Sequence, residues 1–477
     1  MRGGRGPSKA AADDRTALEE VSAGSPGRKI LIDTCQVVVT MDDAGTEIPS
    51  GSILVDGGGI SWVGAGNPPD VDNVIRVDGR GTVAVPGFVN THHHFYQALT
   101  RVRAQGQGLF GWLRTLYPVW AALDEEWART AARVALAELA LSGCSTTCDH
   151  PYLFPKGSLA VLAAEVDAAR EVGLRFHLCR GSMDRGVSHG GLPPDSIVED
   201  ADVILAETET AVRRFHDRAP GARCRLAIAP CSPFSVSHAL MKESAALARR
   251  LGVRLHTHIA ETVDEEAYCV ETYGCRPLEL LDSLGCLGRD VWLAHCVHVN
   301  DEDIRRIAGT GTGVAWCPTS NLRLGSGIAP ARNLADAGAP VGLAVDGSAS
   351  NDSGHMLAEA RMGMLVSRTG LGSSLSARDV LRIATRGGAA VLGRDDIGSI
   401  EPGKRADIAL VSVDGVWFAG AEADPVAAVL YCAPRCVRDL FVEGNAVVKN
   451  GCLVTADQDE IAATARRASR RIMAQNP

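Results

Sequence analysis

The middle of the chain alternates short apolar runs with longer stretches rich in alanine, leucine, glutamate and arginine. Eight runs predict β-strands at residues 82–94, 144–150, 174–181, 225–231, 253–258, 291–297, 313–317 and 341–346. Stretches of helical composition separate most of them, such as residues 126–142, 159–172 and 239–251. Eight repeated strand–helix units predict an α/β fold, a (β/α)8 TIM barrel, whose active site lies at the carboxyl ends of the strands.

The first run ends in three consecutive histidines. Residues 82–89 are apolar, and His92, His93 and His94 follow them closely. Because side chains alternate along a strand, His92 and His94 share one face and His93 takes the other. Neutral imidazole is a common ligand of zinc and iron, so the sequence predicts a metal site at this strand end.

Later runs also end in side chains that can bind a metal or move a proton. His258 ends the fifth run with Glu261 three residues beyond it, His295 ends the sixth run and Asp346 ends the eighth. In this order and spacing, the strand ends resemble the metal-dependent amidohydrolase superfamily. The resemblance is to its branch of deaminases and related hydrolases that act on purines, pyrimidines and triazines. It covers nearly the whole chain after residue 28.

The resemblance implies a metal site with four ligands: His92, His94, His258 and Asp346. A bound ion lowers the pKa of a coordinated water from about 15.7 toward about 7. Binuclear members of the superfamily use a carboxylated lysine on the fourth strand, but residues 226–231 contain neither lysine nor an acid. We therefore expect one divalent ion per chain, with zinc favoured and iron as the alternative.

The resemblance also implies three catalytic residues: Glu261, His295 and Asp346. Glu261 would be the general acid that protonates a ring nitrogen and then the leaving amine. His295 would orient or polarise the attacked water, and Asp346 would accept a proton from it. Two alternatives stay open, namely Glu261 as an exposed charge at a helix start and His295 as a fourth histidine ligand.

Nearby polar residues are interpreted as structural rather than catalytic. His256 shares the face of His258 and is expected in the layer beneath the metal. His93 is expected to pack outside the barrel. For Asp149 and His150, at the end of the second run, a structural role is the preferred interpretation.

Three residues are candidates for substrate binding: Gln97, Trp112 and Arg180. The Gln97 amide could pair with the amide edge of a ring, and Arg180 could bind a ring carbonyl. Trp112 could cover a flat heterocycle or could pack in the core. The segments around these residues resemble purine-deaminating members of the superfamily, and the loop at 181–195 is a plausible pocket rim.

The resemblance implies hydrolytic deamination of a purine-like heterocycle. An isocytosine or hydroxytriazine aminohydrolase is the alternative within the enzymes. A non-catalytic relative that serves in assembly is the alternative of another class, and the intact chemical positions disfavour it.

The two ends of the chain differ from its middle. We expect a disordered tail at 1–28, a β-sandwich built from 29–86 and 395–477 together with a terminal helix, and the barrel at 87–394. A net charge of −9 argues against nucleic acid as a partner. No run approaches the roughly 18 apolar residues that a membrane span needs. We expect a cytoplasmic homo-oligomer with a small-molecule substrate.

Overall fold

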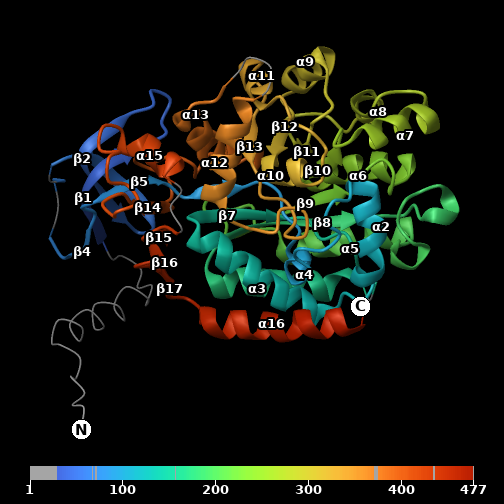
Figure 1. The fold of residues 1–477 in the computed structure, drawn as a ribbon, viewed down its shortest axis with the longest axis horizontal. Coiled ribbons are helices and arrows are strands. Elements are labelled where there is room, and N and C mark those ends of the chain that lie inside the picture. Colours follow the sequence, from blue (N-terminus) through green and yellow to red (C-terminus); the bar gives the residue numbers. More distant parts are fainter. Residues whose placement is uncertain are drawn as a thin grey trace, which may run out of the picture.

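The computed structural model describes residues 29–66, 68–69, 72–155, 157–369, 374–432 and 436–475. The predicted tail at 1–28 lies outside these residues. The described chain forms a barrel and a separate sheet beside it (Figure 1). Its helices include none that combines the length and the apolar character needed to cross a membrane.

Eight parallel strands form the barrel, in the order in which they follow along the chain. They are β6 (Phe88–Asn90), β7 (Cys144–Asp149), β8 (Arg175–Ser182), β9 (Cys224–Pro230), β10 (Arg254–Ile259), β11 (Val291–His295), β12 (Gly313–Trp316) and β13 (Val341–Leu343). The first and last strands meet where the Thr91 amide donates to the carbonyl of Leu343 (3.1 Å). The predicted (β/α)8 barrel is thus confirmed.

The predicted first strand at 82–94 is two strands. β5 (Thr82–Pro86) pairs with β1 and β14 in the separate sheet, whereas β6 starts the barrel. Gly87 lies between them, and its amide donates to the carbonyl of Asp407. A Cβ at Gly87 would lie 2.5 Å from Cβ of Ser145, so only glycine fits this crossing point. One apolar run therefore supplies both units of the fold.

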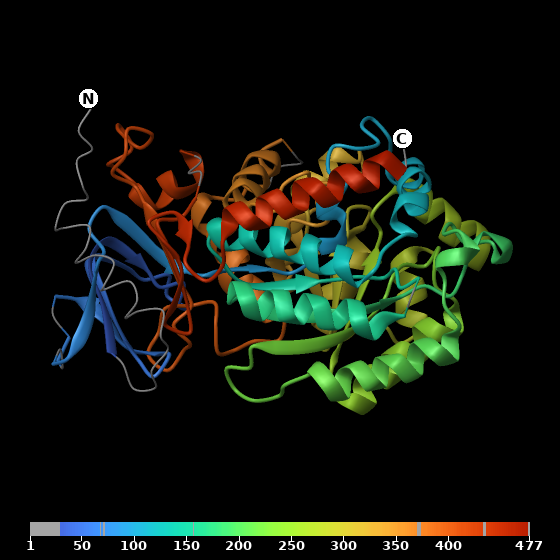
Figure 2. The same cartoon turned by 90° about the horizontal axis from the view of Figure 1, so that it is seen from below.

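Helices surround the barrel and lie between its strands in the chain (Figures 1 and 2). They are α2 (Leu109–Trp120), α3 (Glu125–Leu141), α4 (Ser158–Val172), α5 (Ala201–Phe215), α6 (His238–Leu251), α7 (Val263–Tyr273), α8 (Pro277–Ser283), α9 (Asp301–Thr310), α10 (Pro318–Arg323), α11 (Ala331–Asp336), α12 (Met356–Ser367), α13 (Ala377–Arg382) and α14 (Gly388–Val391). Short helical turns are η1 (Phe95–Leu99), η2 (Val187–His189), η3 (Asp195–Ile197) and η4 (Ile383–Gly387). The helices predicted at 126–142, 159–172 and 239–251 correspond to α3, α4 and α6.

Both ends of the described chain join one mixed sheet of nine strands. The strands besides β5 are β1 (Lys29–Val39), β2 (Glu47–Asp56), β3 (Gly59–Ala65), β4 (Val74–Asp78), β14 (Ile408–Ser412), β15 (Asp439–Val442), β16 (Asn445–Lys449) and β17 (Cys452–Leu453). Ile32, Ile53, Ile408 and Phe441 belong to one buried apolar cluster, so strands from the two ends pack on each other. The predicted union of the chain ends is confirmed.

Two helices follow β14 towards the end of the chain. They are α15 (Pro425–Tyr431) and α16 (Gln458–Gln475). The last helix leaves the sheet and lies along α3 of the barrel (Figure 2). A buried ion pair also joins the two units, because Arg175 Nε donates to Asp407 Oδ2 at 2.7 Å.

Candidate metal and catalytic site

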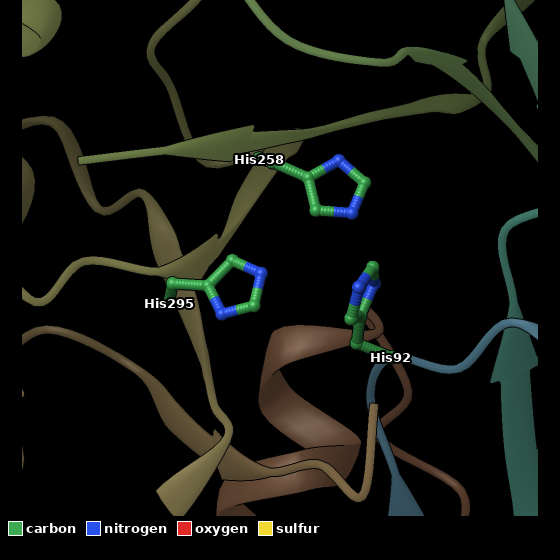
Figure 3. Close-up of side chains that lie close together, drawn as sticks. All are labelled: His92, His258 and His295. Atoms are coloured by element: carbon green, nitrogen blue, oxygen red, sulfur yellow. The ribbon is translucent and has the colours of Figure 1, made fainter. Parts of the chain in front are cut away.

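Four predicted metal ligands converge at the carboxyl end of the barrel. His92 Nε2 and His94 Nε2 lie 3.4 and 3.5 Å from Asp346 Oδ1. His94 Nε2 also lies 3.1 Å from His258 Nε2. Figure 3 shows the rings of His92, His258 and His295 turned towards one another from different elements of the barrel. Side chains from the first, fifth, sixth and eighth strand ends thus share one site.

Hydrogen bonds at the outer ring nitrogens fix two of the histidine tautomers. His94 Nδ1 lies 2.7 Å from the carbonyl of His150, and His258 Nδ1 lies 2.8 Å from the carbonyl of Cys231. Because a carbonyl can only accept, both Nδ1 atoms carry the proton and both Nε2 atoms present a lone pair. Outer partners of this kind orient histidines that bind metals.

His92 is oriented through a second histidine. His256 Nδ1 lies 2.9 Å from the carbonyl of Trp292, so this nitrogen donates and His256 Nε2 is left as an acceptor. His92 Nδ1 lies 2.8 Å from that Nε2 and therefore donates to it. The inward atom, His92 Nε2, again presents a lone pair. His256 also stacks on Trp292, in the layer expected from the sequence.

Asp346 is held in an uncommon backbone conformation. Its φ is 60° and that of His295 is 74°, in the left-handed region where residues other than glycine are uncommon and which recurs at functional sites. Ser320 Oγ donates to Asp346 Oδ2 at 2.5 Å. Burial alone would raise the pKa of Asp346, but the close approach of His92 and of the other nearby histidines holds it well below its usual range. This carboxylate is thus ionised among imidazoles.

Glu261 and His295 form a pair at the edge of the ligand cluster. Glu261 Oε2 lies 3.5 Å from His295 Nε2, and His295 Nδ1 lies 2.9 Å from Asn321 Oδ1. Glu261 is 4% exposed, which argues against the alternative of an exposed charge at a helix start. Burial raises the pKa of its carboxyl to about 7, with His295 opposing the shift. An acid with such a pKa can both give and take a proton near neutral pH.

The ligand cluster fits a divalent metal ion. His92 Nε2 is buried and has no hydrogen-bond partner. Ligand atoms of His92, His94 and Asp346 lie within 4.8 Å of one another, as do those of His92, His258 and His295. Imidazole nitrogens with a carboxylate are a donor set that zinc takes in catalytic sites. The second set keeps His295 open as a further ligand.

A cavity opens beside this cluster. Its walls are mostly apolar and aromatic, and no lysine or arginine is among its lining residues. They are His94, Gln97, Leu109, Trp112, Leu113, Tyr117, Tyr152, Cys231, Ser232, Phe234, His258, Glu261, His295, Leu324, Asp346 and Ser350. The cavity therefore suits an uncharged, flat molecule better than an anion.

The three candidate substrate residues lie in different places. Gln97 and Trp112 line the cavity. Gln97 Oε1 accepts from the Ala349 amide at 3.3 Å, and the Gln97 amino group donates to the Tyr96 hydroxyl at 3.5 Å. Trp112 Nε1 donates to the Ala349 carbonyl at 3.0 Å. Arg180 does not line the cavity. Its guanidinium instead donates to Glu199 Oε1 at 2.7 Å, because a buried cation needs a carboxylate.

The second strand end has the structural role expected of it. Asp149 Oδ1 accepts from the Phe95 amide at 2.6 Å and so fixes the turn after His94. His150 Nε2 lies 2.9 Å from the carbonyl of Ala229. Neither residue is among those that line the cavity.

Sequence reasoning missed the residues that hold Glu261 and His295 in place. Glu265 accepts from the amides of Ala260 and Glu261, each at 2.8 Å, and so fixes the turn that carries Glu261. A second glutamate four residues after the first was the available signal. The sequence around Asn321, which orients His295, contains no such signal, because Asn321 lies in the short helix α10, which follows a different strand from His295.

Comparisons with known proteins show the family of the chain. The model of the Amidohydrolase family matches residues 83–447. The chain is 46% identical to 8-oxoguanine deaminase of Pseudomonas aeruginosa over 90% of this chain and 96% of the relative. It is 37% identical to hydroxydechloroatrazine ethylaminohydrolase of Pseudomonas sp. strain ADP, over 92% of this chain and 95% of the relative. The crystal structure of atrazine chlorohydrolase from Arthrobacter aurescens, complexed with zinc, superimposes with a TM-score of 0.88 at 33% identity, covering 92% of this chain and all of the other. The chain therefore belongs to the amidohydrolase family.

Proposed function

We propose that this protein hydrolyses 8-oxoguanine to urate and ammonia. The observation that carries the proposal is the 46% identity to 8-oxoguanine deaminase across nearly the full length of both chains. The reaction adds one water, breaks the exocyclic C2–N bond and releases the amine as ammonia. The cavity beside the ligand cluster has mostly apolar and aromatic walls and no lysine or arginine, which supports a neutral, flat substrate of this kind.

The proposed metal site holds one zinc ion per chain. His92, His94, His258 and Asp346 would bind it, and the ion would supply a water activated for attack. Zinc is preferred over iron because imidazole and carboxylate ligands suit it and because the related atrazine chlorohydrolase was crystallised with zinc.

Protons are moved by the carboxylates beside the site. Asp346 accepts a proton from the attacking water, and His295, held by Asn321, orients that water. Glu261 protonates the ring nitrogen next to C2, then takes up the remaining proton of the attacking water and passes it to the departing amine, and the proton held by Asp346 returns Glu261 to its starting state. The buried position of Glu261 on the cavity wall supports this role, because a general acid must reach the reacting ring.

Two of the candidate substrate residues keep their proposed roles. The Gln97 amide would bind the amide edge of the ring, and Trp112 would form part of the wall against which the ring lies. The arrangement of Arg180 favours a different role, in which its pairing with Glu199 supports the loop beyond β8.

A triazine aminohydrolase is the second candidate. The 37% identity to hydroxydechloroatrazine ethylaminohydrolase favours it, since that relative also matches nearly the whole chain. Both candidates use the same metal and proton-transfer residues, so the cavity walls decide between them. One unmatched buried hydrogen bond can cost several orders of magnitude in rate.

The deciding experiment is ammonia or amine release across a substrate panel. Zinc-loaded enzyme would be tested with 8-oxoguanine, guanine, isocytosine and a hydroxylated aminotriazine, with Glu261→Gln as the background control. We expect kcat/KM to be highest for 8-oxoguanine by at least tenfold. A higher value for the triazine or isocytosine would contradict the proposed substrate and leave the aminohydrolase chemistry standing.

A further inference from the structure

The amino end of the barrel carries a second cluster of polar side chains, far along the strands from the metal site. His177, Arg225 and Arg254 lie near the starts of β8, β9 and β10. His177 pairs in register with Arg225, and Arg254 with Ala227. Arg254 precedes His256 by two residues, so both face the inside of the barrel. The floor of the barrel interior is thus lined with cationic groups.

These residues border a cavity of about 350 Å³. Three arginines and two histidines contribute to its lining, and no carboxylate does. The lining residues are His177, His216, Arg218, Arg225, Leu226, Ala227, Gly252, Val253, Arg254, Leu392 and Gly393. The cavity beside the metal site has the opposite charged residues: Glu261 and Asp346 line it, and no arginine does.

The three arginines have neutral partners. Arg225 donates to the carbonyl of Gly393 at 3.2 Å, Arg254 to those of Arg289 at 2.9 Å and Val391 at 2.8 Å, and Arg218 to that of Leu251. Within the described ranges, none of the three has a carboxylate within 4.0 Å. The Nε atoms of Arg225 and Arg254 are also buried without a hydrogen-bond partner.

Other arginines at the same end of the barrel are paired with acids. Arg175 binds Asp407, and Arg394 holds Asp396 through two nitrogens at 2.7 and 2.8 Å. A buried guanidinium without a counter-charge is costly, because burial penalises its charged form. Arg225 and Arg254 are half-buried and, unlike Arg175 and Arg394, contact no carboxylate of the described chain, so their charge is open to a compensating anion.

The pKa values of Arg254 and Arg225 are lowered, which is consistent with the lack of a carboxylate in contact with either residue. Burial lowers the pKa of Arg254 to about 10, with Arg225 adding to the effect and Asp290 opposing it. Asp290 itself pairs with Arg249, so its charge is shared. Burial and then Arg394 lower the pKa of Arg225.

We propose that this floor cavity binds a compact oxyanion with two negative charges, either inorganic phosphate or the phosphate of an ester. Arg225 and Arg254 would hold it through their guanidinium groups, and Arg218 would approach from the rim. Guanidinium groups match phosphate geometry and bind it with charge-assisted hydrogen bonds. The layer of Trp292 and His256 separates this cavity from the metal site.

Calorimetric titration of the zinc-loaded enzyme with inorganic phosphate, at constant ionic strength, tests the proposal. We expect one saturable site in the wild type. Arg225→Met and Arg254→Met should each weaken phosphate binding by about tenfold or more, since each removes a charged partner. Arg213→Met is the matched control, because Arg213 is exposed and already paired with Glu209, and it should bind phosphate like the wild type.

Several outcomes would overturn the proposal. One is that the wild type shows no saturable phosphate binding. Another is that the wild type and both variants bind phosphate equally, as expected if phosphate bound at the metal instead. Arg225→Met keeps the proposal testable if Arg254→Met fails to fold, because Arg225 makes a single carbonyl contact. Titration with AMP distinguishes the two sources of phosphate: tighter binding than phosphate assigns the site to an ester, and weaker binding assigns it to the free ion.

Discussion

The two ends of the barrel are built from the same strands but gather opposite chemistry. At the carboxyl end, three Nε2 lone pairs of His92, His94 and His258 meet the ionised Asp346. At the amino end, Arg225 and Arg254 bring donors together with no acid opposite them. One strand, β10, supplies both ends, since Arg254, His256 and His258 follow one another on the same face.

The difference shows how hydrogen bonding decides what each end can bind. At the carboxyl end, backbone carbonyls take the outer protons of His94 and His258, and His256 takes that of His92, so the inner atoms attract a cation. At the amino end, backbone carbonyls take only part of the guanidinium protons, and the remainder attract an anion. The same type of acceptor thus prepares a cation site in one place and an anion site in the other.

Removing a ligand should abolish the function of the carboxyl end. We expect His258→Ala to lose most of its bound metal and nearly all deaminase activity, because the imidazole lone pair is one of the four proposed ligands. Elemental analysis alongside ammonia release checks this. His189→Ala, at an exposed loop position, is the control and should keep both properties. Full metal content in His258→Ala would remove this residue from the ligand set.

Replacing the proposed proton carrier should spare the metal. Glu261→Gln is expected to lower kcat by about 10²–10⁴-fold, the usual contribution of general acid–base catalysis. Its zinc content should match that of the wild type, because Glu261 is not among the proposed ligands. Glu302→Gln, on the exposed side of α9, is the control for the charge change. A near-normal kcat for Glu261→Gln would contradict the proposed mechanism.

The amino end offers a direct comparison of a paired and an unpaired arginine. Arg175→Met should lower the free energy of unfolding by about 3–5 kcal/mol, because Asp407 is left as a buried charge without its partner. Arg225→Met should cost less than about 1 kcal/mol in phosphate-free buffer, because it leaves no carboxylate unpaired. Denaturant unfolding measures both. Equal losses would show that Arg225 is as well compensated as Arg175.

The hydrogen bond between His92 and His256 should affect how tightly the protein binds metal. His256→Phe keeps a ring to stack on Trp292 but removes the acceptor of the His92 proton, so zinc should bind about 10–100-fold more weakly. His256→Gln can still accept that proton and should bind zinc more tightly than the phenylalanine variant. Competition with a chelator gives both affinities. Equal zinc affinity in His256→Phe and the wild type would reduce His256 to a packing residue.

Most of the fold could be predicted because its signals are local. Each barrel strand is a buried apolar run, and Ala-rich amphipathic helices lie between many of them. The division of residues 82–94 into β5 and β6 could not be predicted in this way. Both parts are equally apolar, and only the approach of Gly87 to Ser145 and Asp407, which are distant in sequence, marks the crossing point.

The site residues that could be predicted from the sequence are those that lie at the ends of strands. His92, His94, His258, His295 and Asp346 all do, so the barrel brings them together. Arg180 also lies near a strand end, but the partners Glu199 and Glu207 that draw its guanidinium away lie beyond the next loop. Partners from later in the chain, such as Asn321 and Ser320, cannot be recognised without the fold.

The central claim is that one metal ion lies at the carboxyl end of the barrel. An anomalous difference map, recorded at the zinc edge from crystals of the zinc-loaded enzyme, tests it most directly. The account predicts one peak per chain, about 2.0–2.1 Å from the Nε2 atoms of His92, His94 and His258 and beside Asp346. A second peak of similar height, or a single peak away from these residues, would contradict it.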